Sequence, residues 1–125
     1  MNHTIAESKE FCSHSADMIK LAAEKGIDIG VAPSYLSLQT VKENAGNMIV
    51  AAQDCHFADH GAYTGFVSIP MIKELGIDWC LVGHSERRLY AAETSLTCNR
   101  KIKALIENKM TVVYCVGESL ADFES

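Results

Sequence analysis

Residues 80–88 read Cys80-Leu81-Val82-Gly83-His84-Ser85-Glu86-Arg87-Arg88, and this stretch decides how the whole chain is interpreted. Residues 79–82 are apolar and partly β-branched, which is typical of a buried strand. Gly83 then frees the backbone, and a histidine, a serine, a glutamate and two arginines follow within five positions. Because α/β folds carry their active sites at the carboxyl ends of strands, this density of reactive side chains predicts a functional site.

Simpler interpretations of the same residues exist. A single histidine after a glycine is often only a loop residue held by the backbone, and two adjacent arginines are often solvated helix charges. Ser85 and Glu86 could instead cap a short helical turn. The stretch also invites comparison with the G-x-S-x-G nucleophile elbow of hydrolases, but its second glycine would have to stand where Arg87 is, so the elbow is excluded.

Composition indicates an ordinary globular protein of one domain, or part of one. The 125 residues are 48% hydrophobic and 22% charged. They show no disorder signature, no low-complexity segment, and no change in composition along the chain that would mark a second domain. The net charge is −5 and the eleven lysines and arginines are scattered rather than arranged in a stripe. We therefore expect no nucleic-acid partner.

The five cysteines are odd in number and show no C-x-x-C spacing, and three of them lie in apolar runs. This pattern favours buried thiols in a reducing compartment over a disulfide framework or a zinc site. The N-terminus is polar, without the apolar core of a signal peptide, and no run approaches the roughly 20 apolar residues of a membrane span. We expect a cytoplasmic protein with no membrane partner.

The chain alternates between helical and strand-like segments. Thr4-Ile5-Ala6-Glu7 has the form of a capping box, and the apolar period after it predicts one helix that ends near Lys25-Gly26. Strands are expected over residues 27–32, 48–52, 79–82 and 111–116, and helices over 36–45, from Ser68 to 75, and after the cap Thr94. Such βα alternation is the signature of a parallel sheet.

Residues 54–67 carry neither period and predict a long loop, which is usually functional when it lies inside a compact domain. Cys55, His56 and His60 are close enough in sequence to suggest metal ligands, but a fixed site needs further ligands and a regular element to hold them. The small and aromatic residues at 61–65 suit insertion into a partner better. We expect an association loop and no metal site.

Six segments, in order, resemble those of the triosephosphate isomerase family. They are Val31-Ala32-Pro33, Ala51-Ala52-Gln53-Asp54-Cys55, Gly61-Ala62-Tyr63-Thr64-Gly65, Leu75-Gly76, Gly83 to Arg88, and Cys115-Val116-Gly117-Glu118. The resemblance covers essentially the whole chain. It implies a (β/α)8 scaffold, interconversion of dihydroxyacetone phosphate and D-glyceraldehyde 3-phosphate in glycolysis and gluconeogenesis, no cofactor, and a cytoplasmic homodimer.

The resemblance also implies roles for individual residues. His84 matches the imidazole that polarises the substrate carbonyl and stabilises the enediolate, a role that comes with the family, whose histidine is kept neutral by a helix N-terminus. Glu86 matches an acidic residue beside the substrate, with Ser85 as its partner. Thr64, with Tyr63 and Gly65 beside it, matches the tip of the loop that crosses into the other subunit's active site.

Two departures from the family pattern limit what the chain can do. A complete barrel needs about 250 residues, so residues 1–125 are expected to form a partial barrel, roughly strands two to five with their helices. The substrate-binding lysine of the first strand matches nothing here, and neither do the catalytic glutamate, the lid or the phosphate-binding glycines of the second half. We therefore carry two hypotheses: part of an isomerase that is inactive alone, or a non-catalytic half-barrel module that associates with a copy or a complementary half.

Overall fold

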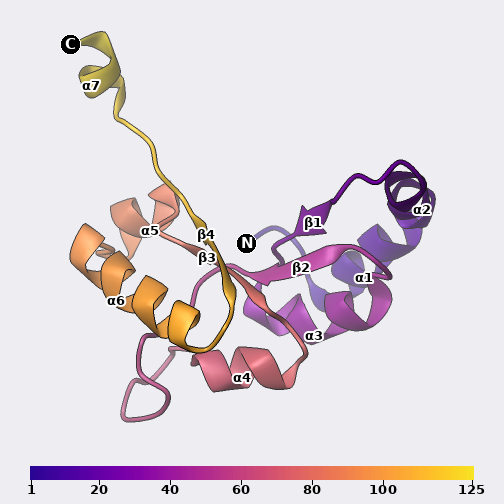
Figure 1. The fold of residues 1–125 in the computed structure, drawn as a ribbon, viewed down its shortest axis with the longest axis horizontal. Coiled ribbons are helices and arrows are strands. Elements are labelled where there is room, and N and C mark those ends of the chain that lie inside the picture. Colours follow the sequence, from indigo (N-terminus) through magenta and orange to yellow (C-terminus); the bar gives the residue numbers. More distant parts are fainter.

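The computed structural model describes residues 1–125 and contains one four-stranded parallel sheet (Figure 1). The strands are β1 (Gly30–Val31), β2 (Ile49–Ala52), β3 (Trp79–Val82) and β4 (Thr111–Tyr114), in the spatial order β1-β2-β3-β4. Every neighbouring pair is parallel. Sequential parallel neighbours joined through helices are the arrangement of a (β/α)8 barrel opened part of the way round, so the predicted fold class is confirmed.

Seven helices accompany the sheet: α1 (Ile5–His14), α2 (Ala16–Glu24), α3 (Tyr35–Asn44), α4 (Ile69–Glu74), α5 (Ser85–Tyr90), α6 (Ser95–Glu107) and α7 (Leu120–Glu124). In Figure 1, α3 lies beside β2 and α1 packs against α3, whereas α6 lies beside β3 and β4. The same view shows α7 standing away from the rest at the end of an extended segment that continues β4. None of the helices is long and apolar enough to cross a membrane.

The first helix begins where the sequence predicts, but it is broken in two. The capping box is present: the Glu7 N–H donates to the Thr4 hydroxyl (3.3 Å), and the Thr4 N–H donates to the Glu7 carboxylate (2.7 Å). The expectation of one continuous helix is wrong, because α1 ends at His14 and α2 starts at Ala16. Ser15 at the break has φ −94° and ψ −3°, which departs from regular helical geometry, and its side chain makes no capping hydrogen bond.

Two strands are shorter than predicted, because a residue belongs to a strand only where it pairs with a residue of the neighbouring strand. Of residues 27–32 only Gly30 and Val31 pair with β2, which begins at Ile49 opposite Gly30. At the other edge, Tyr114 lies opposite Val82, the last residue of β3, and the ladder ends there. Since β1 and β4 are the edge strands, neither has a second neighbour that would extend it.

The hydrophobic core lies between the helices and the outer face of the sheet. Cys80 and Val82 of β3 are fully buried on this face, whereas Trp79 and Leu81, which alternate with them, are only half-buried on the other. Helix side chains complete the core, chiefly Leu38, Val41, Ile69, Ile72 and Leu105. The opposite, inner face is apolar and open, with a hollow of about 350 Å³ lined by residues that include Ile49, Ala51, Trp79, Leu81 and Val113.

Candidate active site

His84 stands at the start of α5, directly after the turn that ends β3. It is the N-cap residue of α5, and its Nδ1 accepts a hydrogen bond from the backbone N–H of Glu86 at 3.2 Å. A ring nitrogen that accepts carries no proton, so the hydrogen of the neutral imidazole sits on Nε2. The Glu86 carboxylate lies 3.8 Å from the same Nδ1, which as an acceptor makes no ion pair with it. His84 is therefore arranged to donate from Nε2.

A hollow of about 690 Å³ opens beside His84 at the carboxyl ends of the strands. This volume is within the usual range of sites for small molecules. The Gln53 side-chain amide donates to the Ala32 carbonyl at 2.9 Å and so joins the end of β2 to the end of β1. The lining residues are Met1, Asn2, Ala32, Gln53, Leu81, His84, Glu86, Arg87, Tyr90 and Ala91. The hollow lies where the sequence predicts a site, at the end of β3, and the site itself stays a prediction.

The three predicted catalytic residues do not all reach this hollow. His84 and Glu86 line it, with 44% and 79% of their side chains exposed. Ser85 is exposed at the first turn of α5 and is not part of the lining. No hydrogen bond joins the Ser85 hydroxyl to Glu86, so the partnership between these two residues stays a prediction.

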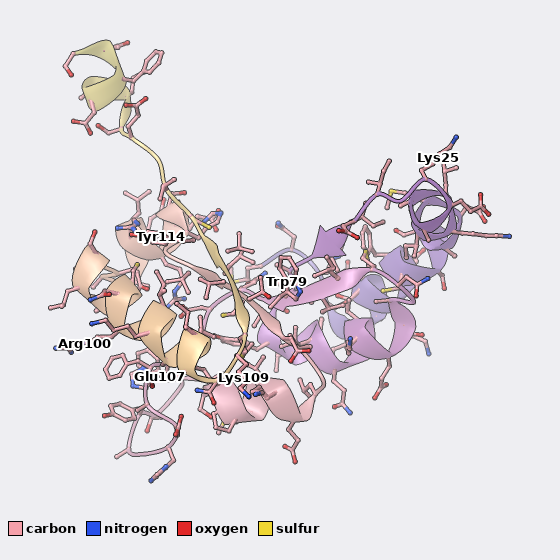
Figure 2. All side chains as sticks on the ribbon, viewed as in Figure 1. Lys25, Trp79, Arg100, Glu107, Lys109 and Tyr114 are labelled. Carbon is pink, nitrogen blue, oxygen red and sulfur yellow. The ribbon has the colours of Figure 1, made fainter.

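Gly83 is required by the close approach of Arg88. Its φ is +78°, and a Cβ at this position would lie 3.0 Å from both the Arg88 guanidinium and the Cys98 sulfur. The Arg88 Nε donates to the Gly83 carbonyl at 3.0 Å, and its Nη2 donates to the Tyr114 hydroxyl at 3.2 Å. Tyr114 is labelled on β4 in Figure 2, beside α5. These two hydrogen bonds hold the Arg88 side chain in place, so it is not a freely solvated charge.

A buried ionic cluster shares Arg87 with the lining of the hollow, and it was not predicted from the sequence. Lys101 of α6 donates at 2.9 Å to Asp54, just beyond β2, and at 2.9 Å to Glu93, between α5 and α6. The three side chains are only 3% to 4% exposed. Arg87 of α5 completes the cluster, with its Nε 3.0 Å from Asp54 Oδ2, close enough for an ion pair although off the line of a directed hydrogen bond. Two cations thus neutralise two anions.

The pKa values of this cluster follow from burial set against pairing. Burial disfavours the ionised form of Glu93, but the hydrogen bond and charge of Lys101 outweigh it and hold the Glu93 pKa below its ordinary value. Burial likewise disfavours the charged Lys101, but Glu93 and Asp54 together raise the Lys101 pKa above its ordinary value. Both groups therefore stay charged at neutral pH.

One signal in the sequence could have revealed the cluster. Cys98, Lys101 and Leu105 share one face of α6, and all three are buried. A lysine at a buried position needs an anionic partner, and Asp54 stands two positions after the predicted strand at 48–52. The sequence does not identify Asp54 as the partner of Lys101, because the two residues lie 47 positions apart in the chain.

The predicted loop at residues 54–67 is present and is closed on itself. The His56 N–H donates to the Val67 carbonyl at 2.8 Å. The His56 ring packs against Phe57, Tyr63 and Phe66 at centroid distances of 4.2 to 4.6 Å. Burial among these rings lowers the His56 pKa, because the charged form would lose its solvation. Aromatic packing therefore gives this loop its shape.

Thr64, Tyr63 and Gly65, the residues predicted to contact a partner subunit, differ in their exposure to solvent. Thr64 and Gly65 are exposed at the tip, whereas the Tyr63 ring is 45% exposed and leans on His56. Cys55 is fully buried in the core, away from the open part of the loop. No group of three or more histidine, cysteine, aspartate or glutamate side chains lies close enough together to hold a metal ion.

Comparison with known proteins agrees with this geometry. The sequence model of the triosephosphate isomerase family matches residues 1–125. Triosephosphate isomerase of Chlorobium chlorochromatii is 41% identical over 129 residues, which cover 100% of this chain and 50% of that protein. That of Trichlorobacter lovleyi is 46% identical over 112 residues, 87% of this chain and 45% of that protein. The chain spans about half the length of the curated relatives it matches. Since the family model covers every residue, the chain belongs to the triosephosphate isomerase family.

Proposed function

We propose that this chain supplies the histidine-bearing half of an active site that interconverts dihydroxyacetone phosphate and D-glyceraldehyde 3-phosphate. The observation that carries the proposal is the state of His84: its Nδ1 is occupied by the Glu86 N–H, and its side chain lines the hollow at the strand ends. The triosephosphate isomerases that match the whole chain support the choice of substrate. In the cell, this reaction belongs to glycolysis and gluconeogenesis in the cytoplasm.

In this mechanism the Nε2–H of His84 donates a hydrogen bond to the substrate carbonyl. The bond strengthens as the carbonyl oxygen gains negative charge in the enediolate, so it stabilises the transition state more than the ground state. The N-cap position holds the ring before substrate arrives, and no reorganisation is needed during the reaction. Oriented donors of this kind commonly contribute about 10² to 10³ in rate.

The second requirement is a base that removes the proton next to the carbonyl. General base catalysis commonly contributes about 10² to 10⁴ in rate. Glu86 also lines the hollow, but the resemblance gives it a hydrogen-bonding role, and the family's base, lysine and phosphate-binding segments match no residue of this chain. We therefore propose that residues 1–125 alone do not catalyse the isomerisation.

A complementation assay tests this proposal. Turnover of both triose phosphates is measured on the 125-residue chain alone and after addition of the carboxyl-terminal half of the Chlorobium chlorochromatii relative. We expect activity only in the mixture, lowered about 10² to 10³-fold by His84→Ala and kept with Lys103→Gln, an exposed position on α6. Activity of the chain alone at the rate of a complete enzyme would refute the assignment of the missing base.

A second function is favoured by the two open edges of the sheet. Val113 and Tyr114 on β4 are 39% and 42% exposed, and Val116, Leu120 and Phe123 beyond it are more than 70% exposed. Exposed strand edges beside apolar side chains tend to pair with other chains. The chain could then be a non-catalytic half-barrel that self-associates, which sedimentation velocity would detect as species heavier than 13.7 kDa.

We also propose that the active assembly is a homodimer in which the loop at 54–67 contacts the partner. The exposed tip residues Thr64 and Gly65 support this role, and the aromatic packing beneath them keeps the loop in one shape. Thr64→Arg should weaken the dimer of the complemented enzyme in sedimentation experiments. An unchanged dimer would remove this loop from the interface.

A further inference from the structure

The helix that carries His84 has no hydrophobic anchor. None of the residues of α5 is buried, and its large apolar side chains, Leu89 and Tyr90, are 73% and 84% exposed. A six-residue helix is too short to be stable through its own hydrogen bonds. Polar contacts made by its arginines must therefore fix where α5 lies, and with it the orientation of the His84 ring.

The contact of Arg87 reaches a buried carboxylate that is itself paired. Its Nε is 3.0 Å from Oδ2 of Asp54, whose side chain is only 4% exposed. Asp54 is itself held by Lys101 at 2.9 Å and 3.2 Å through its two carboxylate oxygens. Lys101 in turn is fixed by Glu93. This chain of charges joins α5 to the end of β2 and to the buried face of α6.

Arg88 cannot replace this connection. Its strongest contact, from Nε to the Gly83 carbonyl at 3.0 Å, lies within the same turn and so moves together with α5. Its outer contact is to the Tyr114 hydroxyl on β4, an edge strand whose Tyr114 side chain is 42% exposed. Arg88 also reaches the buried Cys98 sulfur of α6 through its Nη2 at 3.7 Å, but a neutral thiol is a weak hydrogen-bond acceptor. The contact between Arg87 and Asp54 is therefore the one ion pair that links α5 to a buried charge elsewhere in the fold.

We propose that Asp54 is a positioning residue: through Arg87 it fixes α5 and thereby sets the orientation of the His84 imidazole. This inference rests on the proposed function, because it assigns Asp54 a role in the chemistry of His84. Asp54 itself lies outside the lining of the hollow and acts only through Arg87. The network around it would serve to hold α5 in place in addition to neutralising buried charge.

Amide hydrogen exchange of the 125-residue chain tests the proposal directly. The backbone N–H groups of Arg87 and Arg88 donate to the His84 carbonyl, and that of Glu86 donates to the His84 ring, so their exchange reports whether the first turn of α5 is formed. The variants are Asp54→Asn, Arg87→Gln and Arg87→Lys, with Lys103→Gln as the control. The ¹⁵N resonances of the His84 ring are recorded in parallel.

In Arg87→Gln we expect exchange at these three amides to be at least tenfold faster, while the amides between β2 and β3 change less than twofold. The His84 ring nitrogens should shift toward values for mixed tautomers, and Arg87→Lys should restore part of the protection. If Asp54→Asn fails to fold, Arg87→Gln still decides, because it leaves the contacts among Asp54, Lys101 and Glu93 in place. Exchange in α5 within twofold of the unmodified chain, or equal acceleration across the sheet, would overturn the proposal.

The outcome can be separated from that of the proposed function. If His84→Ala leaves turnover of the complemented enzyme unchanged, the proposed function fails whatever the exchange data show. If His84→Ala lowers turnover as expected but α5 exchange is insensitive to Arg87→Gln, only the positioning role of Asp54 fails. When both hold, Asp54→Asn should lower kcat of the complemented enzyme at least tenfold with KM changed less than threefold.

Discussion

Replacing Lys101 by methionine should be the most destabilising single change in the ionic cluster. Methionine fills a similar volume but lacks the ammonium group. In the unmodified chain Lys101 Nζ lies 2.9 Å from a carboxylate oxygen of Asp54 and 2.9 Å from one of Glu93. Asp54 keeps Arg87 as a partner, whereas Glu93 loses its paired cation and keeps neutral contacts such as that from the Cys98 sulfur at 3.6 Å. A buried carboxylate is then left without a compensating charge.

The magnitude follows from the burial of the cluster. Breaking a buried ion pair by removing one partner commonly costs about 3 to 5 kcal/mol, and the side chains of Lys101, Asp54 and Glu93 are at most 4% exposed. For a domain of this length the unfolding entropy is roughly 0.26 kcal/mol per degree, so the melting temperature should fall by about 10 to 20 °C. Lys103→Met, on the exposed side of the same helix, should change stability by less than about 0.5 kcal/mol.

Urea denaturation followed by circular dichroism, at several pH values, provides the assay. The loss in Lys101→Met should shrink as the pH is lowered toward the ordinary pKa of a glutamate, because protonation removes the unpaired buried charge. A free energy of unfolding within about 0.5 kcal/mol of the unmodified chain at pH 7 would refute the reasoning. So would a loss that does not depend on pH.

Three further predictions follow from the same contacts. Gly83→Ala should cost about 1 to 3 kcal/mol in urea denaturation, because φ is +78° and the new methyl would meet Arg88 and Cys98 at 3.0 Å; no loss would mean that the turn relaxes freely. His84→Ala should lower kcat of the complemented enzyme about 10² to 10³-fold while the melting temperature stays nearly constant, and unchanged turnover would remove His84 from the mechanism. The cluster should also shape the pH dependence of stability in the unmodified chain. Glu93, whose pKa is lowered, stabilises the fold above its ordinary pKa of 4.5, and this contribution is lost as the pH falls through its folded pKa; Lys101, whose pKa is raised, stabilises below 10.5, and this is lost as the pH rises through its folded pKa. Lys101→Met should lack the alkaline loss in a pH series of denaturation curves.

Local chemistry was readable from the sequence wherever neighbours along the chain decide the outcome. The capping box of Thr4 and Glu7 and the cap of Ser68 form as predicted, because the hydrogen-bonding groups are only three positions apart. Apolar runs of strand length gave β2 and β3, and Gly83 marked the turn where His84 emerges. His84 at the end of a parallel strand needed no tertiary information, since the end of such a strand is where sites form.

Contacts between distant residues decided the rest. The lengths of β1 and β4 depend on which residues of β2 and β3 stand opposite them, and this register is not written in either strand alone. The break at Ser15 likewise separates two helices that the apolar period had joined. The ionic cluster forms because Asp54, Glu93 and Lys101 meet from three separate segments. Residues of these types usually lie on the surface, but here they are buried and paired with one another. The sequence alone determined which side chains stand at the strand ends. Only the tertiary structure decided which charged groups are buried together. The reason is that desolvation of a group depends on all the atoms packed around it and not on its neighbours in the chain.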